Sequence, residues 1–216
     1  DIFPLSYNFC ASSIVLETEY PNLRLASCCK VEVVKGAEGD LRALPDSGGK
    51  LAGWVLGLGE GRDAFALAAF AEKLPDGLYR LGEVPEFCAG AQAALGWLMG
   101  GYAFVRYKKT SRKSPRLVLP GGVDGEEIAR IAEALFLARD LINTPANDMG
   151  PAELEAAARA LASKHGAKVA VVKGAALAKN YPLIQAVGQG SARPPRLIEL
   201  TWGKPSAPKV TLVGKG

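Results

Sequence analysis

Histidine is almost absent from this chain of 216 residues. With a single histidine, His165, no HExxH zinc motif can be written, and a Ser-His-Asp triad would have to recruit this one imidazole. His165 precedes Gly166 at the expected end of a helix, where the negative end of the helix dipole favours such a side chain. We therefore interpret His165 as a helix-end residue, and any bound metal would need carboxylate, lysine or water ligands.

Cysteine is also scarce, and long apolar runs are missing. The four cysteines form no CxxC pair, which argues against a disulfide framework and favours the reducing environment of the cytoplasm. Gly, Lys, Asp or Pro interrupts every hydrophobic stretch before the roughly 18 residues of a transmembrane helix, so we expect no membrane partner. The first ten residues lack the basic start and apolar run of an export signal. Because 49% of the residues are hydrophobic, the chain can bury a core. Together with the cysteine pattern and the missing apolar runs, this leads us to expect a soluble, globular, cytoplasmic protein.

Strand and helix patterns alternate along the chain. The first half is expected to contain strands at 51–58, 102–107 and 117–119, with helices at 62–73 and 90–99. From residue 126 to 142, apolar side chains recur every three or four positions, as on an amphipathic helix. This helix should end at Asn143-Thr144-Pro145, because the residue before a proline is disfavoured in helical geometry.

The second half continues the alternation. A helix should begin at Pro151 and end at Gly166, a glycine suited to a left-handed cap. Apolar runs then predict strands at 167–172, 196–202 and 209–213. Helices that alternate with apolar strands favour an α/β protein with a parallel or mixed sheet, and Pro120-Gly121-Gly122 suggests a domain boundary.

Two glycine-rich segments have the look of nucleotide motifs, but neither is complete. The segment GQGS at 188–191 lacks the third glycine and the following long helix of a dinucleotide loop. The segment GKG at 214–216 follows an expected strand, yet it lacks the upstream glycine and the Ser or Thr of a phosphate loop. We do not expect nucleotide binding.

One cluster of positive charge could contact the phosphates of a nucleic acid. It contains Tyr107 and the cations Arg106, Lys108, Lys109, Arg112, Lys113 and Arg116. Runs of this kind are more often solvated hairpin loops, so nucleic-acid binding is an alternative rather than the main expectation. The net charge of +4 does not by itself indicate a partner.

Three segments, in this order and spacing, resemble the leucyl aminopeptidase (M17-type) family. They are ARDLINTPAN at 138–147, AVGQGS at 186–191 and VTLVGKG at 210–216. The resemblance implies a small amino-terminal α/β (macro-like) domain, a connecting helix, and the beginning of a larger α/β catalytic domain with a mixed sheet. On this basis we assign 1–120 to the first domain, 121–147 to the connecting helix and turn, and 148–216 to the first part of the catalytic domain. Residues 1–36 show no visible match.

The resemblance also implies a metal ligand. The matching lysine of the family lies at the end of a strand and binds one of two divalent ions, which points to Lys215 as a metal ligand; manganese or zinc is the expected metal. Asn143, Pro145, Asn147 and Pro151 match the family too, and we expect them to shape the turn after the helix. No catalytic residue is expected among residues 1–216, because the remaining ligands that the resemblance implies would lie beyond Gly216.

The expected function is release of amino-terminal, leucine-like residues from peptides by a water that two metal ions activate. Peptides with a free amino terminus are the expected substrates, and a homohexamer is the expected assembly. Residues 1–216 alone are expected to be inactive. The alternatives are a DNA-binding or scaffold role, or a catalytically incomplete fragment of the same fold.

Overall fold

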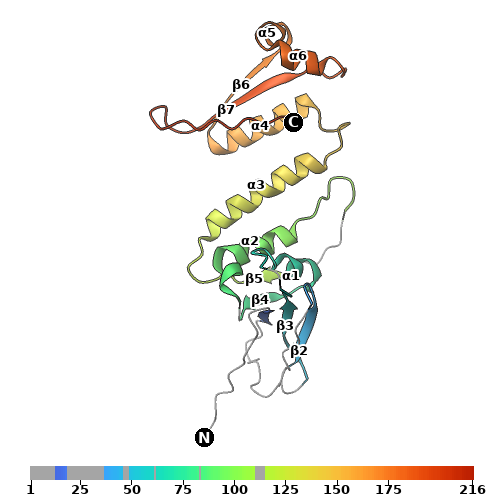
Figure 1. Cartoon of the computed structure of the whole chain (residues 1–216), viewed down its shortest axis with the longest axis vertical. Helices are drawn as coiled ribbons and strands as arrows, with labels where there is room; N and C mark the ends of the chain where they lie inside the picture. The colour runs from blue at the N-terminus through green and yellow to red at the C-terminus, as the bar shows by residue number, and fades with distance from the viewer. Residues whose placement is uncertain (1–12, 19–36, 46–48, 61, 83, 110–114) are drawn as a thin grey trace. The chain divides into compact units, whose positions relative to one another are not determined.

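The computed structural model describes residues 13–18, 37–45, 49–60, 62–82, 84–109 and 115–216. The chain divides into two compact units, Asp1–Arg139 and Asp140–Gly216 (Figure 1). Three of the four cysteines lie outside the described residues, and the fourth, Cys88, is fully buried. Burial, and then the charge of Asp63, raises the pKa of the Cys88 thiol, so this cysteine is an unreactive core residue.

The first unit is built on a five-stranded mixed sheet with the strand order β2-β3-β1-β4-β5. The strands are β1 (Ser13–Thr18), β2 (Leu41–Pro45), β3 (Leu51–Gly57), β4 (Leu78–Leu81) and β5 (Arg116–Leu117). Neighbouring strands are antiparallel except for the parallel pair β4 and β5. The expected strand at 51–58 is thus confirmed as β3, and only the start of the one at 117–119 is present, as part of β5.

Among the described residues of this unit, two helices and one short 3-10 turn precede the long helix α3 (Gly125–Asn143): α1 (Ala68–Lys73), η1 (Glu86–Cys88) and α2 (Gly90–Gly101). Their apolar faces and the sheet form one buried cluster. It consists of Leu56, Leu58, Leu67, Phe70, Ala71, Leu74, Tyr79, Cys88, Ala93 and Trp97. Side chains from strand, helix and loop therefore meet in a single core, as an α/β layer requires.

The backbones of α1 and α2 approach each other closely through glycines on α2. A Cβ atom added to Gly100 would lie 2.6 Å from Ala68 Cα and would overlap the Ala68 carbonyl oxygen. One turn earlier, a Cβ at Gly96 would lie 3.1 Å from the Phe65 carbonyl oxygen. Because backbone atoms cannot move aside as a flexible side chain can, α2 fits against α1 only with glycine at position 100.

Helix α3 (Gly125–Asn143) is the amphipathic helix that the sequence predicts. Asp124 Oδ1 accepts hydrogen bonds from the backbone amides of Glu126 and Glu127 (3.0 and 3.1 Å), which satisfies two free donors of the first turn. At the other end, Thr144 Oγ1 donates to the Asp140 carbonyl oxygen (2.6 Å). The helix ends where Pro145 was expected to end it.

The second unit packs one long helix against a two-stranded sheet. It contains α4 (Pro151–His165), β6 (Lys168–Lys173), α5 (Gly174–Asn180), α6 (Pro182–Gly188) and β7 (Arg196–Thr201). Strands β6 and β7 are antiparallel, with Val169 opposite Leu200 and Val171 opposite Ile198. Gly166 caps α4 in the left-handed conformation (φ 67°), as predicted. Among the described helices of either unit, none is both long and apolar enough to cross a membrane.

Two expected strands are wrong. Residues 102–109 follow α2 as irregular chain, and residues 209–213 form no strand although both segments are rich in β-branched or aromatic side chains. A strand is stabilised by its neighbours in a sheet, and neither segment pairs with another in the described part of the chain. Val210, Leu212 and Val213 are accordingly 85–92% exposed.

The close approach of α1 and α2 yields a stability prediction. We expect Gly100→Ala to lower the free energy of unfolding of the first unit by about 1–3 kcal/mol, because the added methyl group overlaps backbone atoms. Urea denaturation followed by circular dichroism measures the change. Gly101→Ala is the matched control, since a Cβ there meets no atom within 4 Å; equal stability of the two variants would contradict the packing argument.

Candidate functional site

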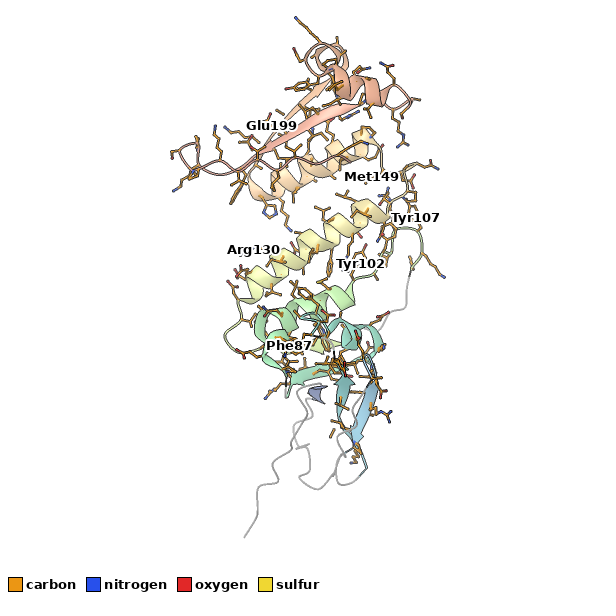
Figure 2. All side chains as sticks on the ribbon, viewed as in Figure 1. Phe87, Tyr102, Tyr107, Arg130, Met149 and Glu199 are labelled. Atoms are coloured by element: carbon orange, nitrogen blue, oxygen red, sulfur yellow. The ribbon has the colours of Figure 1, made fainter. Side chains whose placement is uncertain are left out.

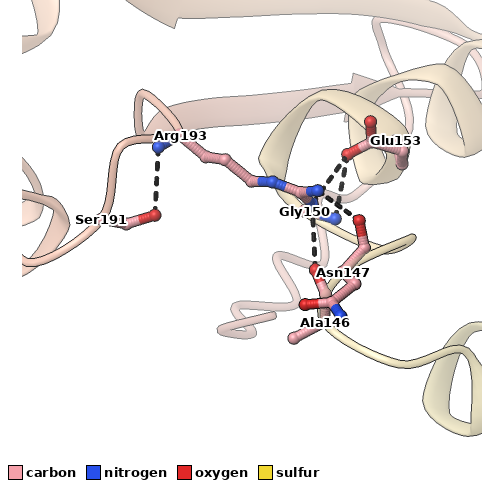
Figure 3. A network of polar contacts seen from close by, with 6 residues as sticks. All are labelled: Ala146, Asn147, Gly150, Glu153, Ser191 and Arg193. Carbon is pink, nitrogen blue, oxygen red and sulfur yellow. Dashed lines mark hydrogen bonds and ion pairs between the residues drawn. The ribbon is translucent and has the colours of Figure 1, made fainter.

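Arg193 joins two of the three family-like segments. Its guanidinium donates hydrogen bonds to the carbonyl oxygens of Ala146 (2.9 Å) and Asn147, in the turn that follows α3 (Figure 3). The backbone amide of Arg193 donates to Ser191 Oγ (3.1 Å), so the loop after α6 is braced internally as well. The turn at 144–150 and the loop at 188–195, about 45 residues apart in the sequence, are thereby held together.

The same guanidinium lies over the start of α4. Glu153 Oε2 accepts a hydrogen bond from the Gly150 backbone amide (2.9 Å) and lies 3.6 Å from Arg193 Nη1. Hydrogen bonds from the backbone amides of Glu153 and Gly150, together with the charge of Arg193, lower the pKa of the Glu153 carboxyl. A Cβ at Gly150 would lie 2.8 Å from Arg193 Cδ, so glycine leaves the room that the arginine occupies.

A second ionic contact joins α4 to β7. The carboxylate of Glu155, a buried residue, binds Arg196 through Oε2 and Arg159 through Oε1 (2.8 Å). Hydrogen bonds from Arg159 and Arg196 lower the pKa of Glu155, and the charge of Lys173 acts in the same direction. The Nε atom of Arg196 is buried and has no partner among the described residues. The ion pair between Glu155 and Arg196 therefore joins α4 to β7 at a partly desolvated position.

The loop after α6 borders an open hollow of about 410 Å³. Its lining contains Gly174, Ala175, Ala178, Gln185, Gly188, Gln189, Ser191, Ala192, Pro194 and Pro195. The ring of Pro195 lies against Gly188, where a Cβ would be 2.6 Å from Pro195 Cβ. None of the described residues that line the hollow is ionisable, so they offer amide and hydroxyl groups but no acid, base or charged metal ligand.

Lys215 lies in the exposed segment at the end of the second unit. Beside it, a Cβ at Gly216 would lie 2.9 Å from Leu154 Cδ2, which places this segment next to α4. No group of three or more His, Cys, Asp or Glu side chains that could hold a metal ion occurs in the described part of the chain. The described residues thus offer Lys215 as a single amine, and they do not form a two-metal site by themselves.

The other residues singled out from the sequence have structural or surface positions. His165 is the last residue of α4, and its carbonyl oxygen accepts a hydrogen bond from Trp202 Nε1 (3.0 Å). The prediction of a helix-end residue is confirmed. Arg106, Tyr107, Lys108, Lys109 and Arg116 are exposed, whereas Arg112 and Lys113 lie outside the described residues. Asn143, Pro145, Asn147 and Pro151 lie at the end of α3, in the following turn, or at the start of α4.

Sequence reasoning did not single out Arg193, Glu153, Glu155 or Arg196. The partners are separated by about 40 residues, and no periodicity within one element brings an arginine of a loop next to a glutamate of a helix. One feature of the sequence could have drawn attention to the two arginines: Arg193 and Arg196 flank Pro194-Pro195, close to the AVGQGS segment.

Comparison with protein families gives two matches. The catalytic domain of the cytosol aminopeptidase family matches residues 136–216, and the amino-terminal domain of M17 aminopeptidases matches residues 22–120. The second match includes residues 22–36, where the sequence alone showed no resemblance. Both domain types of one family therefore occur in this chain, in the order that the family has.

Individual relatives agree with these matches. The probable cytosol aminopeptidase of Streptomyces coelicolor is 34% identical over 238 residues, which cover 89% of this chain and 46% of that protein. The corresponding protein of Rhodococcus jostii is 39% identical over 142 residues, which cover 57% of this chain and 28% of that protein. The chain thus spans less than half the length of these relatives.

Solved structures support the same conclusion. The cytosol aminopeptidase from Coxiella burnetii superimposes with a TM-score of 0.70 at 34% identity, covering 80% of this chain and 38% of that one. The bottromycin maturation enzyme BotP, solved in complex with Mn, superimposes with a TM-score of 0.62 at 29% identity, covering 78% of this chain and 40% of that one. The fold and its segments define an α/β protein of the aminopeptidase type. The chain belongs to the M17 (leucyl, or cytosol) aminopeptidase family.

The Glu155 contacts predict how stability depends on pH. The pKa of Glu155 is lowered in the folded state, so its stabilising contribution is present above its ordinary value of 4.5 and is lost as pH falls through the lower, folded value. We expect the free energy of unfolding of the second unit to fall below about pH 4.5, and Glu155→Gln to weaken this dependence. Denaturant unfolding between about pH 3 and pH 7 tests this, with the exposed Glu199→Gln as control; matching profiles for both variants would refute it.

The Arg193 contacts predict a local effect. Arg193→Ala should release the turn at 144–150 and lower the free energy of unfolding by about 1 kcal/mol, because two carbonyl oxygens lose their hydrogen-bond donor. Arg193→Lys should not restore the turn, since one ammonium group does not reproduce the planar fork of a guanidinium. Hydrogen exchange of the Asp148 and Met149 amides, which donate to the Pro145 carbonyl oxygen, reports on the turn. Unchanged exchange in both variants would show that Arg193 is not its support.

Proposed function

We propose that this protein is a metal-dependent aminopeptidase that releases amino-terminal residues, leucine-like ones in particular, from peptides. The observation that carries the proposal is the joint presence of the M17 amino-terminal and catalytic domain matches in one chain. The relatives from Streptomyces and Coxiella, described as cytosol aminopeptidases, support the same activity. Peptides with a free amino terminus are the substrates in this proposal, and the cytoplasm is its location.

Lys215 is the metal ligand in this proposal, and manganese or zinc is the metal. The support is its place in the VTLVGKG segment, inside the catalytic-domain match, and the manganese complex of the similar BotP. A lysine binds a metal only as the neutral amine, so the ion itself must favour loss of the proton. Two such ions would supply a Lewis acid and an activated water. Among the described residues, Lys215 is the ligand in this proposal, and no cluster of His, Cys, Asp or Glu accompanies it there.

The assembly proposed is a homohexamer, by analogy with the family. A catalytically incomplete protein of the same fold is the alternative, and it is distinguished by whether the protein expressed from its complete gene is active. Residues 1–216 alone are expected to be inactive, because the described residues form no cluster of metal ligands and Lys215 by itself cannot hold two metal ions.

Hydrolysis of a chromogenic leucine amide by the protein expressed from its complete gene tests the proposal. We expect activity that a chelator removes and that added manganese or zinc restores. Lys215→Ala should lower kcat/KM at least about 100-fold and reduce the metal bound per chain, because a ligand is lost. Metal content is measured by elemental analysis.

Lys209→Ala is the matched control, since Lys209 is an exposed lysine that directly precedes the VTLVGKG segment. It should keep both activity and metal. A leucine amide with an acetylated amino group should not be cleaved if the free amine is recognised. Full activity of Lys215→Ala, or activity that survives complete metal removal, would rule out the assignment of Lys215.

A further inference from the structure

The hollow beside α6 is formed by a part of the chain that has no negative charge. Residues 156–198 contain seven Lys or Arg residues and no Asp or Glu. This stretch includes α5, α6 and the loop at 188–195, which together line the hollow. The next carboxylates along the chain are Glu155, which forms ion pairs on α4 and β7, and Glu199 on β7 (Figure 2). The elements around the hollow therefore favour an anionic ligand.

The polar groups inside the hollow are free to bind. Gln185 and Gln189, one helical turn apart, both line it, and neither side chain forms a hydrogen bond with another described residue. Ser191 Oγ accepts a hydrogen bond from the Arg193 backbone amide (3.1 Å), and its own proton remains to be donated. Since a carboxamide both donates and accepts, these side chains suit a ligand that has donors and acceptors of its own.

The remaining lining is small, apolar and held in place. Ala175 and Ala178 of α5 lie on one side, and Pro194 and Pro195 of the loop on the other. The Arg193 hydrogen bonds to the turn after α3 brace this loop (Figure 3). The volume of about 410 Å³ falls within the range of ligand sites, roughly 300–1,000 Å³. A site whose walls are already braced loses little entropy when a ligand binds.

Two lysines border the lining of α5. Lys179 follows Ala175 by one turn, so it lies on the face of the helix that lines the hollow. It is exposed and forms no ion pair with any described residue. Lys173, also exposed, directly precedes Gly174 at the other end of the helix. An ammonium group is thus available near each end of this wall.

We propose that the hollow binds an acidic peptide segment in an extended conformation. Each peptide group has one N–H donor and one C=O acceptor, which match the Gln185 and Gln189 carboxamides. Asp or Glu side chains of the ligand would pair with Lys173 and Lys179, and its small side chains would lie on the alanines and prolines. A phosphate group only accepts hydrogen bonds, so it would leave the carboxamide oxygens without donors. The proposal goes beyond the aminopeptidase activity and requires neither Lys215 nor a metal.

Fluorescence anisotropy of a hexapeptide of alternating Glu and Ala, titrated with the protein expressed from its complete gene, tests the proposal. The label blocks the peptide's amino terminus, so an aminopeptidase cannot degrade the probe. We expect binding that weakens as salt rises, and no comparable binding of a Lys-Ala hexapeptide. The double variant Gln185→Glu, Gln189→Glu keeps the side-chain shape but repels carboxylates. Its affinity for the acidic peptide should fall at least about tenfold, and its affinity for the basic one should rise.

Two pairs of variants separate the hollow from the rest of the unit. Ala178→Trp should fill the hollow and lower the affinity at least about tenfold, whereas Ala176→Trp, on the same helix but outside the lining, should bind normally. Lys179→Gln should weaken binding about two- to fivefold, as loss of an exposed ion pair does, and the exposed Lys204→Gln should not.

Four results would overturn the proposal. They are absence of acidic-peptide binding at about 100 μM protein and low salt, equal affinity for the two hexapeptides, an equal loss in both tryptophan variants, and displacement of the probe by inorganic phosphate at constant ionic strength as effective as displacement by unlabelled peptide. The last result would assign the hollow to phosphate-bearing ligands instead. Leucine amide hydrolysis is measured separately on the same protein, so this inference and the proposed aminopeptidase activity can fail independently.

Discussion

Two arginine side chains, separated in the sequence by two prolines, hold the second unit together. Arg193 binds the turn after α3 and lies near Glu153, and Arg196 binds Glu155 on the same helix. The intervening prolines fix φ near −65°, so the direction of each arginine relative to the other is restricted before any contact forms. Glycine at 150 and 188 supplies the space that Arg193 and Pro195 need. The position of α4 against β7 depends on this small set of contacts.

The two units differ in what stabilises them. The first has a closed apolar core that combines strands, helices and a 3-10 turn, and its tightest constraint is the steric one between Gly100 and Ala68. In the second, all of whose residues the structure describes, the only buried apolar residues are Ala162 and Leu177, while Glu155 and Thr144 are buried polar residues. Burial of apolar area responds little to salt or mild acid, whereas charge-assisted hydrogen bonds respond to both. High salt or mild acid should therefore lower the stability of the second unit before it lowers that of the first.

Local patterns predicted the two long helices well, missed the short helices α5 and α6, and predicted the strands unevenly. The amphipathic period fixed the long helix to within a residue of Gly125–Asn143, and proline and glycine signals located both ends of α4. Residues 102–107 and 209–213 have strand composition but pair with no neighbour among the residues that the structure describes, because strand formation depends on partners that a local pattern cannot show. For the site, the sequence indicated Lys215 through resemblance alone, and it missed the Arg193 and Arg196 contacts, which join residues about 40 positions apart.

The three family-like segments contribute different groups to the structure. ARDLINTPAN and AVGQGS contribute backbone oxygens and glycines, so their role in the structure is to let Arg193 and Pro195 approach. VTLVGKG contributes an amine, and its apolar side chains are largely exposed in the structure. Metal ligation by Lys215 requires a position held to within a fraction of an ångström, and among the described residues Leu154 of α4 is the side chain next to Gly216. Since Arg193 and Arg196 fix α4, the contacts that stabilise the second unit also support the helix beside which the proposed ligand lies.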